Sequence, residues 1–135
     1  MVTTPTISEI HALLDADEYV EAKSKIDTMR SLGVEDSILL LFEALCAYES
    51  DNDIETLRLI AEFLSSSDSD HKKPYARFTA AICLVNLGLY EQARELLGTV
   101  PESYPDLKET LFNVINECNR QKQAIIHYSK ILKNA

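Results

Sequence analysis

The chain has 135 residues, of which 46% are hydrophobic and 26% charged, and it contains only 3 Gly and 4 Pro. This is the composition of one globular domain, and it excludes a disordered or collagen-like chain. A formal charge of −9 disfavours a nucleic-acid-binding protein, because such a protein must neutralise phosphates. No apolar run approaches the ~20 residues of a membrane span. We therefore expect neither nucleic acid nor a membrane as a partner.

The charge is divided unequally along the chain. Residues 1–70 carry 16 acidic and 4 basic side chains, whereas residues 71–135 carry 6 and 9. The acidic half either keeps the protein soluble or prefers a basic partner. The sign changes within residues 65–74, which have the composition of a flexible connection. An odd number of cysteines and no signal-peptide pattern at the N-terminus predict a reducing, cytoplasmic location.

Helical periodicity runs along nearly the whole chain and predicts an all-α fold. Thr6 and Glu9 have the spacing of a capping box, which predicts a helix over residues 7–15. Asp17 is placed to cap a second helix over residues 18–31, and Gly33 provides a left-handed stop after it.

The later helices are delimited by similar signals. Asp36 precedes the third helix, Pro74 begins the fifth, and Pro101 and Pro105 bracket a turn after the sixth. A short break is expected between residues 118 and 124. The expected ranges are 37–50, 54–64, 74–86, 90–97, 107–118 and 124–132. Eight helices in antiparallel pairs result.

An internal repeat relates these pairs. The segment Asn86–Leu97 resembles the tetratricopeptide repeat, with Gly88 at the turn, Tyr90 below it and the small Ala93 where two helices approach. Corresponding positions recur every 31 to 36 residues along the chain, at Ala22, Leu57, Ala93 and Ala124. The resemblance implies a short α-solenoid of about four antiparallel hairpins with seven to eight helices. It also implies a single domain over residues 1–135, with units at about 6–33, 36–66, 73–100 and 105–133.

Catalytic chemistry is not evident in the sequence. Phosphate-binding loops, nucleophile elbows and metal-binding motifs are all missing. The three histidines, His11, His71 and His127, lie far apart. The cysteines Cys46, Cys83 and Cys118 are 37 and 35 positions apart, which is the repeat period, so their spacing indicates packing rather than metal ligation. We expect no enzyme activity, no metal and no cofactor.

The resemblance also implies a concave groove lined by the first helix of each pair. Its expected lining residues are largely apolar: His11, Leu14, Phe42, Cys46, Glu49, Phe78, Ile82, Val85, Asn113 and Asn116. Such a stripe either receives a partner segment, which is a helix or an extended chain, or forms the solenoid's own core. Self-association would also cover it.

These observations favour a non-enzymatic adaptor or chaperone that binds a protein segment in the cytoplasm, and the acidic half of the chain suits a basic segment. Two alternatives stay open. The chain is similar in size and acidity to small helical-repeat co-chaperones of type III secretion, and it also fits a subunit or fragment of a larger eukaryotic repeat assembly. The rival from another class is an enzyme with an unrecognised site in the groove.

Overall fold

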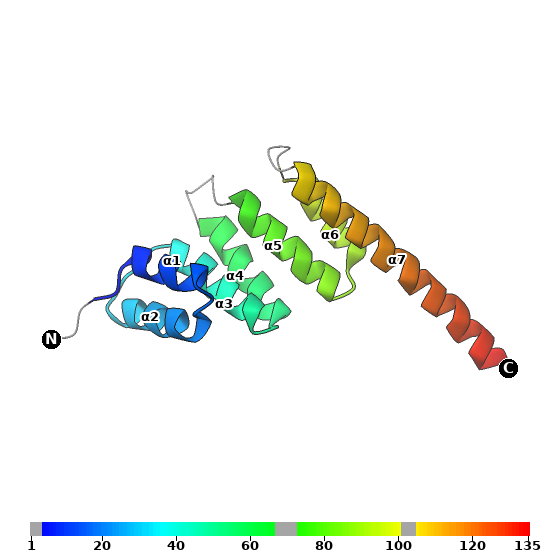
Figure 1. Cartoon of the computed structure of the whole chain (residues 1–135), viewed down its shortest axis with the longest axis horizontal. Coiled ribbons are helices and arrows are strands. Elements are labelled where there is room, and N and C mark those ends of the chain that lie inside the picture. Colours follow the sequence, from blue (N-terminus) through cyan, green and yellow to red (C-terminus); the bar gives the residue numbers. More distant parts are fainter. Residues whose placement is uncertain (1–3, 67–72, 101–104) are drawn as a thin grey trace. The chain divides into compact units, whose positions relative to one another are not determined.

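The computed structural model describes residues 4–66, 73–100 and 105–135, and within these ranges every regular element is a helix (Figure 1). The all-α class is confirmed for this part of the chain. The helices are α1 (Ile7–Asp15), α2 (Tyr19–Ser31), α3 (Ile38–Glu49), α4 (Asp53–Ser66), α5 (Lys73–Asn86), α6 (Tyr90–Gly98) and α7 (Pro105–Asn134). Most of the expected connection at 65–74, with His71, and the expected turn residue Pro101 lie outside the described residues.

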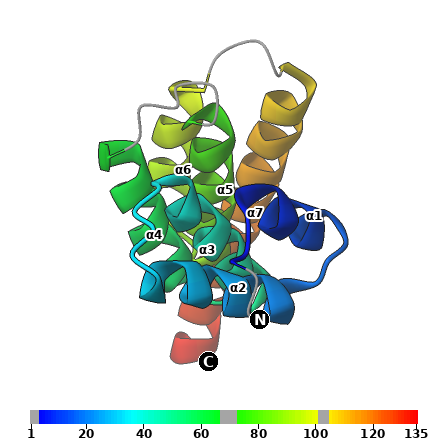
Figure 2. The ribbon, with the colours of Figure 1, turned by 90° about the vertical axis from the view of Figure 1, so that its left-hand side faces the viewer.

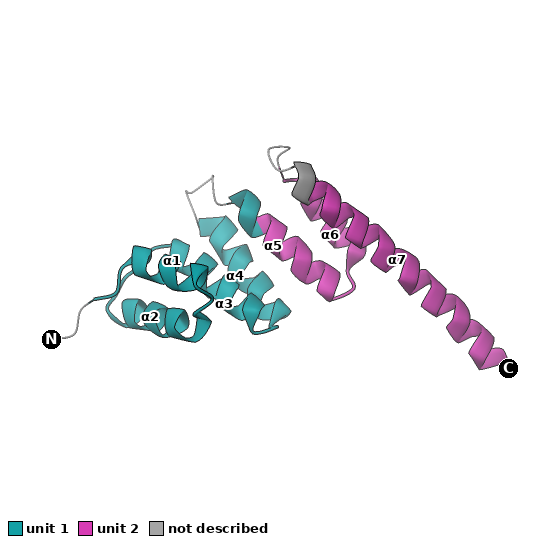
Figure 3. Ribbon diagram, viewed as in Figure 1, with its two compact units in different colours: residues 1–76 teal, residues 77–135 magenta. Residues whose placement is uncertain are grey.

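The chain divides into two compact units, residues 1–76 and 77–135 (Figure 3). In unit 1, α1, α2 and α3 all pack on one another, and α4 packs on α3, as two views of the ribbon show (Figure 2). In unit 2, α6 packs on α7. None of the described helices has both the length and the apolar character needed to cross a bilayer.

The expected helices agree with the observed ones through α6, but the last pair is wrong. Residues 107–118 and 124–132 are parts of one continuous helix, α7, with 30 residues. The intervening sequence Asn-Arg-Gln-Lys-Gln has neither Gly nor Pro, and Arg, Gln and Lys are good helix formers. The break that would make a fourth hairpin therefore does not occur.

The helix starts confirm the cap expected at Thr6 and correct the one expected at Asp17. Thr6 Oγ1 accepts the Glu9 N–H at 3.1 Å, and Asp36 Oδ1 accepts the Ile38 N–H at 3.0 Å. Asp17, expected to cap the second helix, instead adopts a left-handed conformation with φ of 60° and accepts the Tyr19 hydroxyl at 2.8 Å. This hydrogen bond is the main reason why the pKa of Tyr19 is raised above its usual value.

Four helices end in the same kind of turn. The residue with positive φ is Asp17 after α1, Gly33 after α2, Asp51 after α3 and Gly88 after α5. In each turn this residue donates its N–H to the carbonyl three positions back, and the next residue donates to the carbonyl five positions back, with N···O distances of 2.8–3.1 Å. These are Schellman motifs, which satisfy the last carbonyls of a helix. Those after α1, α3 and α5 are 34 and 37 residues apart.

Each unit has its own apolar core. The core of unit 1 is built by α1, α2 and α3, from Ile10, Leu14, Ala22, Ile26, Met29, Leu39, Phe42 and Cys46. The core of unit 2 is built from Ala81, Ala93, Leu97, Val100, Leu111 and Ile115. Ala22 and Ala93, the small residues of the repeat, are fully buried, which allows close approach of their helices.

Candidate functional site

The most unusual surface of the described chain lies on α7. At 1.5 Å per residue its 30 residues extend about 45 Å, whereas α6, which packs on it, has only 9 residues. Leu111 and Ile115 near its start are buried in the core of unit 2. Beyond Ile115, every side chain is exposed except Cys118 and Asn119, which are half-buried. The second half of α7 therefore contributes almost nothing to the core of its own unit.

Large apolar side chains follow one face of this exposed half, and two more, Ile126 and Ile131, are exposed on either side of it. Val114, Ile125, Tyr128 and Leu132 are 44%, 65%, 62% and 76% exposed. Together with the half-buried Cys118 they are separated by 4, 7, 3 and 4 positions, so they share one side of the helix. We call these five residues the α7 stripe. Single exposed apolar residues are ordinary on a protein surface, but several on one face of a helix, here interrupted at Gln121, are typical of an interaction site.

The α7 stripe lies in a basic part of the chain. Residues 116–135 contain four basic side chains and one acidic one. The acidic residue, Glu117, is held by Arg120, whose Nε donates to Oε2 at 3.0 Å, and by Gln121 at 3.2 Å. The bond from Arg120 is the main cause of the lowered pKa of Glu117.

Polar contacts fix the first half of α7 to its neighbours and end near residue 122. Arg94 on α6 donates to Asn116 Oδ1 at 2.7 Å, and Lys108 donates to the Val100 carbonyl at 3.0 Å. Lys122 Nζ lies 5.7 Å from the centre of the Tyr90 ring, a cation–π contact. The base of the α7 stripe is thus anchored, while its distal half projects past the packed region.

The residues expected to line a groove in unit 1 have a different role. Leu14, Phe42 and Cys46 are buried in the core of that unit, so they hold α1 and α3 together and offer no surface to a partner. His11 and Glu49 are exposed. His11 lies 6.1 Å from the Phe42 ring and 3.4 Å from Asp15 Oδ2. In unit 1 the apolar part of the expected stripe is internal core.

In unit 2 the expected residues are divided between core and surface. Phe78, Ile82 and Val85 on α5 are half-buried and pack against the core of the unit. Asn113 and Asn116 on α7 are exposed, and Asn116 is occupied by the bond from Arg94. The structure brings the three apolar residues together on one helix, but as support for the core rather than as open surface.

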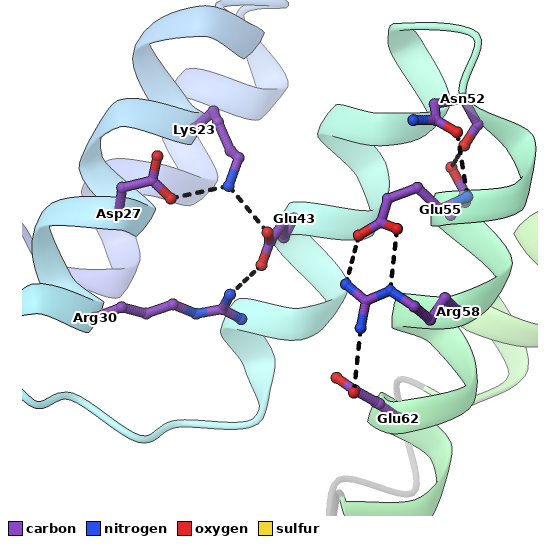
Figure 4. Close-up of polar contacts among 9 residues, drawn as sticks. Lys23, Asp27, Arg30, Glu43, Asn52, Glu55, Arg58 and Glu62 are labelled. Atoms are coloured by element: carbon purple, nitrogen blue, oxygen red, sulfur yellow. Dashed lines mark hydrogen bonds and ion pairs between the residues drawn. The ribbon is translucent and has the colours of Figure 1, made fainter.

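Unit 1 also contains a charged cluster between α2 and α3 (Figure 4). The carboxylate of Glu43, only 14% exposed, pairs with Lys23 at 2.9 Å and with Arg30. Lys23 also pairs with Asp27 at 2.9 Å. Burial works to lower the pKa of Lys23, but its bonds to Asp27 and Glu43 raise it overall. The charges compensate one another, so the cluster stabilises the packing of α2 on α3 and leaves no group poised for proton transfer.

The arrangement of cysteines and acidic groups supports no obvious chemistry in the described residues. Cys46 donates to the Tyr19 carbonyl at 3.7 Å, and burial is the main cause that raises its pKa to about 11. A thiol in that state is a poor nucleophile at neutral pH. No group of three or more His, Cys, Asp or Glu side chains in the described ranges is arranged to hold a metal ion.

Comparisons with protein-family models, with curated proteins and with solved structures found no match.

Sequence reasoning missed the α7 stripe because it placed a helix end in the middle of it. Ile125, Tyr128 and Leu132 were expected to pack inside a fourth hairpin. The signal that reveals the stripe is the series of spacings of 4, 7, 3 and 4 positions from Val114 to Leu132, with no helix-breaking residue between them.

Proposed function

We propose that this protein is a non-enzymatic protein-interaction module, an adaptor or chaperone, whose main contact surface is the α7 stripe. The observation that carries the proposal is the exposure of Ile125, Tyr128 and Leu132 in one row on a helix whose other half is firmly packed. Burial of exposed apolar side chains is the usual driving force of protein association. The contact surface lies on α7 and not in the groove, because the apolar groove residues of unit 1 are core.

The finer architecture belongs to the same proposal. We assign the helices to a tetratricopeptide-like solenoid. The recurrence of one turn type at Asp17, Asp51 and Gly88, at 34 and 37 residues, supports this assignment. The last unit departs from the pattern, since α7 replaces a hairpin with one long helix. In this arrangement the repeats form a scaffold that presents α7.

A reducing location such as the cytoplasm is also proposed. None of the three cysteines, all of which lie in the described ranges, forms a disulfide, and Cys46 and Cys83 are buried. The absence of poised nucleophiles in the described residues supports a role in binding rather than catalysis.

The experiment compares two substitutions of the same kind. Leu132→Glu places a charge in the α7 stripe, and Val20→Glu places one at an 88% exposed position on α2. Proteins retained from the native lysate are quantified by mass spectrometry, and the strongest candidate is purified and titrated against each variant. We expect Leu132→Glu to raise the dissociation constant at least about tenfold, equivalent to ~1.4 kcal/mol, and Val20→Glu to leave it unchanged.

Circular dichroism checks that both variants fold. Because both positions are exposed, both variants should keep the helical signal of the wild type. Equal binding by the wild type and Leu132→Glu would refute the assignment of the surface to α7.

A further inference from the structure

We infer that the α7 stripe binds an amphipathic helix of another protein, and that this helix carries acidic side chains along one border of its apolar face. The inference rests on the proposed function and adds to it the chemistry of the partner.

The shape of the α7 stripe favours a helix as its occupant. From Val114 to Leu132 the stripe extends 18 positions, about 27 Å along the helix axis. Its members are separated by 4, 7, 3 and 4 positions, which keeps them on one helix seam, and such a seam accepts a second helix at a shallow crossing angle. An extended segment gains most of its affinity from the backbone of a sheet edge, and a helix surface has no unpaired backbone to offer.

The charges beside the α7 stripe define which helix fits. At 100° per residue, Lys122 and Lys133 lie roughly 75–95° from the centre of the stripe on the same side. They are 11 positions apart, so they occupy two points on one border. The border on the other side contains Arg120, whose charge is already paired with Glu117. The basic border is therefore one-sided, with Lys133 at its distal end and Lys122, which also contacts the Tyr90 ring, at its proximal end. Acidic residues about three turns apart on a partner match it.

The same charges disfavour a second copy of the chain on this face. Two copies of α7 would bring together two segments that each carry four basic side chains and one acidic one. The only acidic residue available, Glu117, is engaged by Arg120 within its own helix. Like charges along a helix pair oppose association, and they are a common means of rejecting self-pairing.

An anionic lipid surface is a less suitable occupant of the α7 stripe than an acidic helix. The chain as a whole carries −9, and residues 1–70 alone hold 16 acidic side chains, which such a surface repels. A discrete acidic helix needs to approach α7 only.

The test uses two synthetic helical peptides of about three heptads with identical Ile and Leu at the a and d positions. One has Glu at every e and g position and the other has Lys. Binding to the purified full chain is measured by fluorescence anisotropy. We expect the acidic peptide to bind about tenfold tighter, as two ion pairs gained with one peptide and two repulsions with the other imply. The preference should shrink near 1 M salt, where screening acts within ~3 Å.

A matched pair of variants separates contact from overall charge. Lys133→Glu reverses a charge on the border of the α7 stripe, while Lys130→Glu makes the same change three positions earlier, on the side of α7 opposite the stripe. Both lysines are exposed. We expect Lys133→Glu to reduce the preference for the acidic peptide to about threefold or less, and Lys130→Glu to keep most of it. Equal effects of the two variants would overturn the border assignment.

The remaining outcomes distinguish this inference from the proposed function. If both peptides bind equally well and Leu132→Ser abolishes both, α7 is an interaction surface but the acidic preference is wrong. If neither peptide binds, sedimentation and vesicles of phosphatidylserine and phosphatidylcholine identify the alternative. A concentration-dependent dimer lost in Leu132→Ser shows a second copy, and vesicle binding shows a membrane; each overturns the inference. No binding of any kind, to lysate proteins included, overturns the proposed function as well.

Discussion

The turn geometry at Asp51 leads to a specific prediction about the free energy of unfolding. It is the left-handed residue of the turn after α3, with φ of 58°, and it has a side chain where Gly88 has none. The left-handed conformation costs an L-residue about 1–2 kcal/mol, with Asp near the low end. The Asp51 carboxylate also lies at the negative end of the α3 dipole, which costs a further ~0.3–1 kcal/mol. Asp51→Gly removes both costs.

Glycine also increases the conformational freedom of the unfolded chain, which lowers the free energy of unfolding by about 0.5–1 kcal/mol. The balance for Asp51→Gly is a free energy of unfolding higher by about 1 kcal/mol, which corresponds to roughly 3–5 °C in Tm for a chain of this size. Asp51→Ala is the control, since it removes the carboxylate but keeps a β-carbon in the left-handed conformation. We expect it to gain less than half as much.

Two further turns test the same reasoning. Gly88 has φ of 78° and no atom within 4 Å of where a β-carbon would be, so Gly88→Ala reports backbone strain alone and should destabilise by about 1 kcal/mol. Asp17→Gly should gain less than Asp51→Gly, because it loses the bond from the Tyr19 hydroxyl. Urea unfolding followed by circular dichroism measures all four variants. A neutral Gly88→Ala together with a destabilising Asp51→Gly would refute the assignment of these turns.

Three other predictions concern two groups in unit 1 and the exposed end of α7. Glu43→Gln should lower the free energy of unfolding by about 1–3 kcal/mol, because it leaves two cations facing a neutral amide, whereas Asp27→Asn at the exposed end of the cluster should cost under ~1 kcal/mol; urea titrations of both decide. The Cys46 thiol, with a pKa raised from 9.0 to about 11, favours the folded state below pH 9. Its contribution is therefore lost as pH rises from 9 to 11, and stability should decline more steeply over that range in the wild type than in Cys46→Ala. Truncation after residue 122 should leave the free energy of unfolding, measured by urea titration, within ~1 kcal/mol of that of the full chain, because the residues removed are exposed. A larger loss would show that the distal half of α7 belongs to the fold.

The local features of this fold follow closely from the residues. Several of them depend on only a few neighbouring positions: the hydrogen bond to Thr6, the left-handed turns at Gly33 and Gly88, and the buried Ala22 and Ala93. Such features are set by short-range sterics and hydrogen bonding, so a sequence motif is enough to predict them. Asp17 shows the limit of this reasoning. Its position suits a cap equally well, and only the turn geometry, which requires one residue in the left-handed region, decides against it.

Which apolar face becomes core is a different kind of question. Phe42 and Ile125 both recur at helical spacing, and nothing within either helix says that Phe42 will be 5% exposed and Ile125 65%. The difference arises from neighbours: Phe42 is enclosed by α1 and α2, whereas Ile125 lies beyond the reach of the nine residues of α6. A periodic pattern predicts that a helix has an apolar face. Whether that face is buried depends on whether other helices of the unit are long enough to cover it. Where the covering helix ends before the apolar face does, as in α7, the remaining apolar residues are available to another molecule.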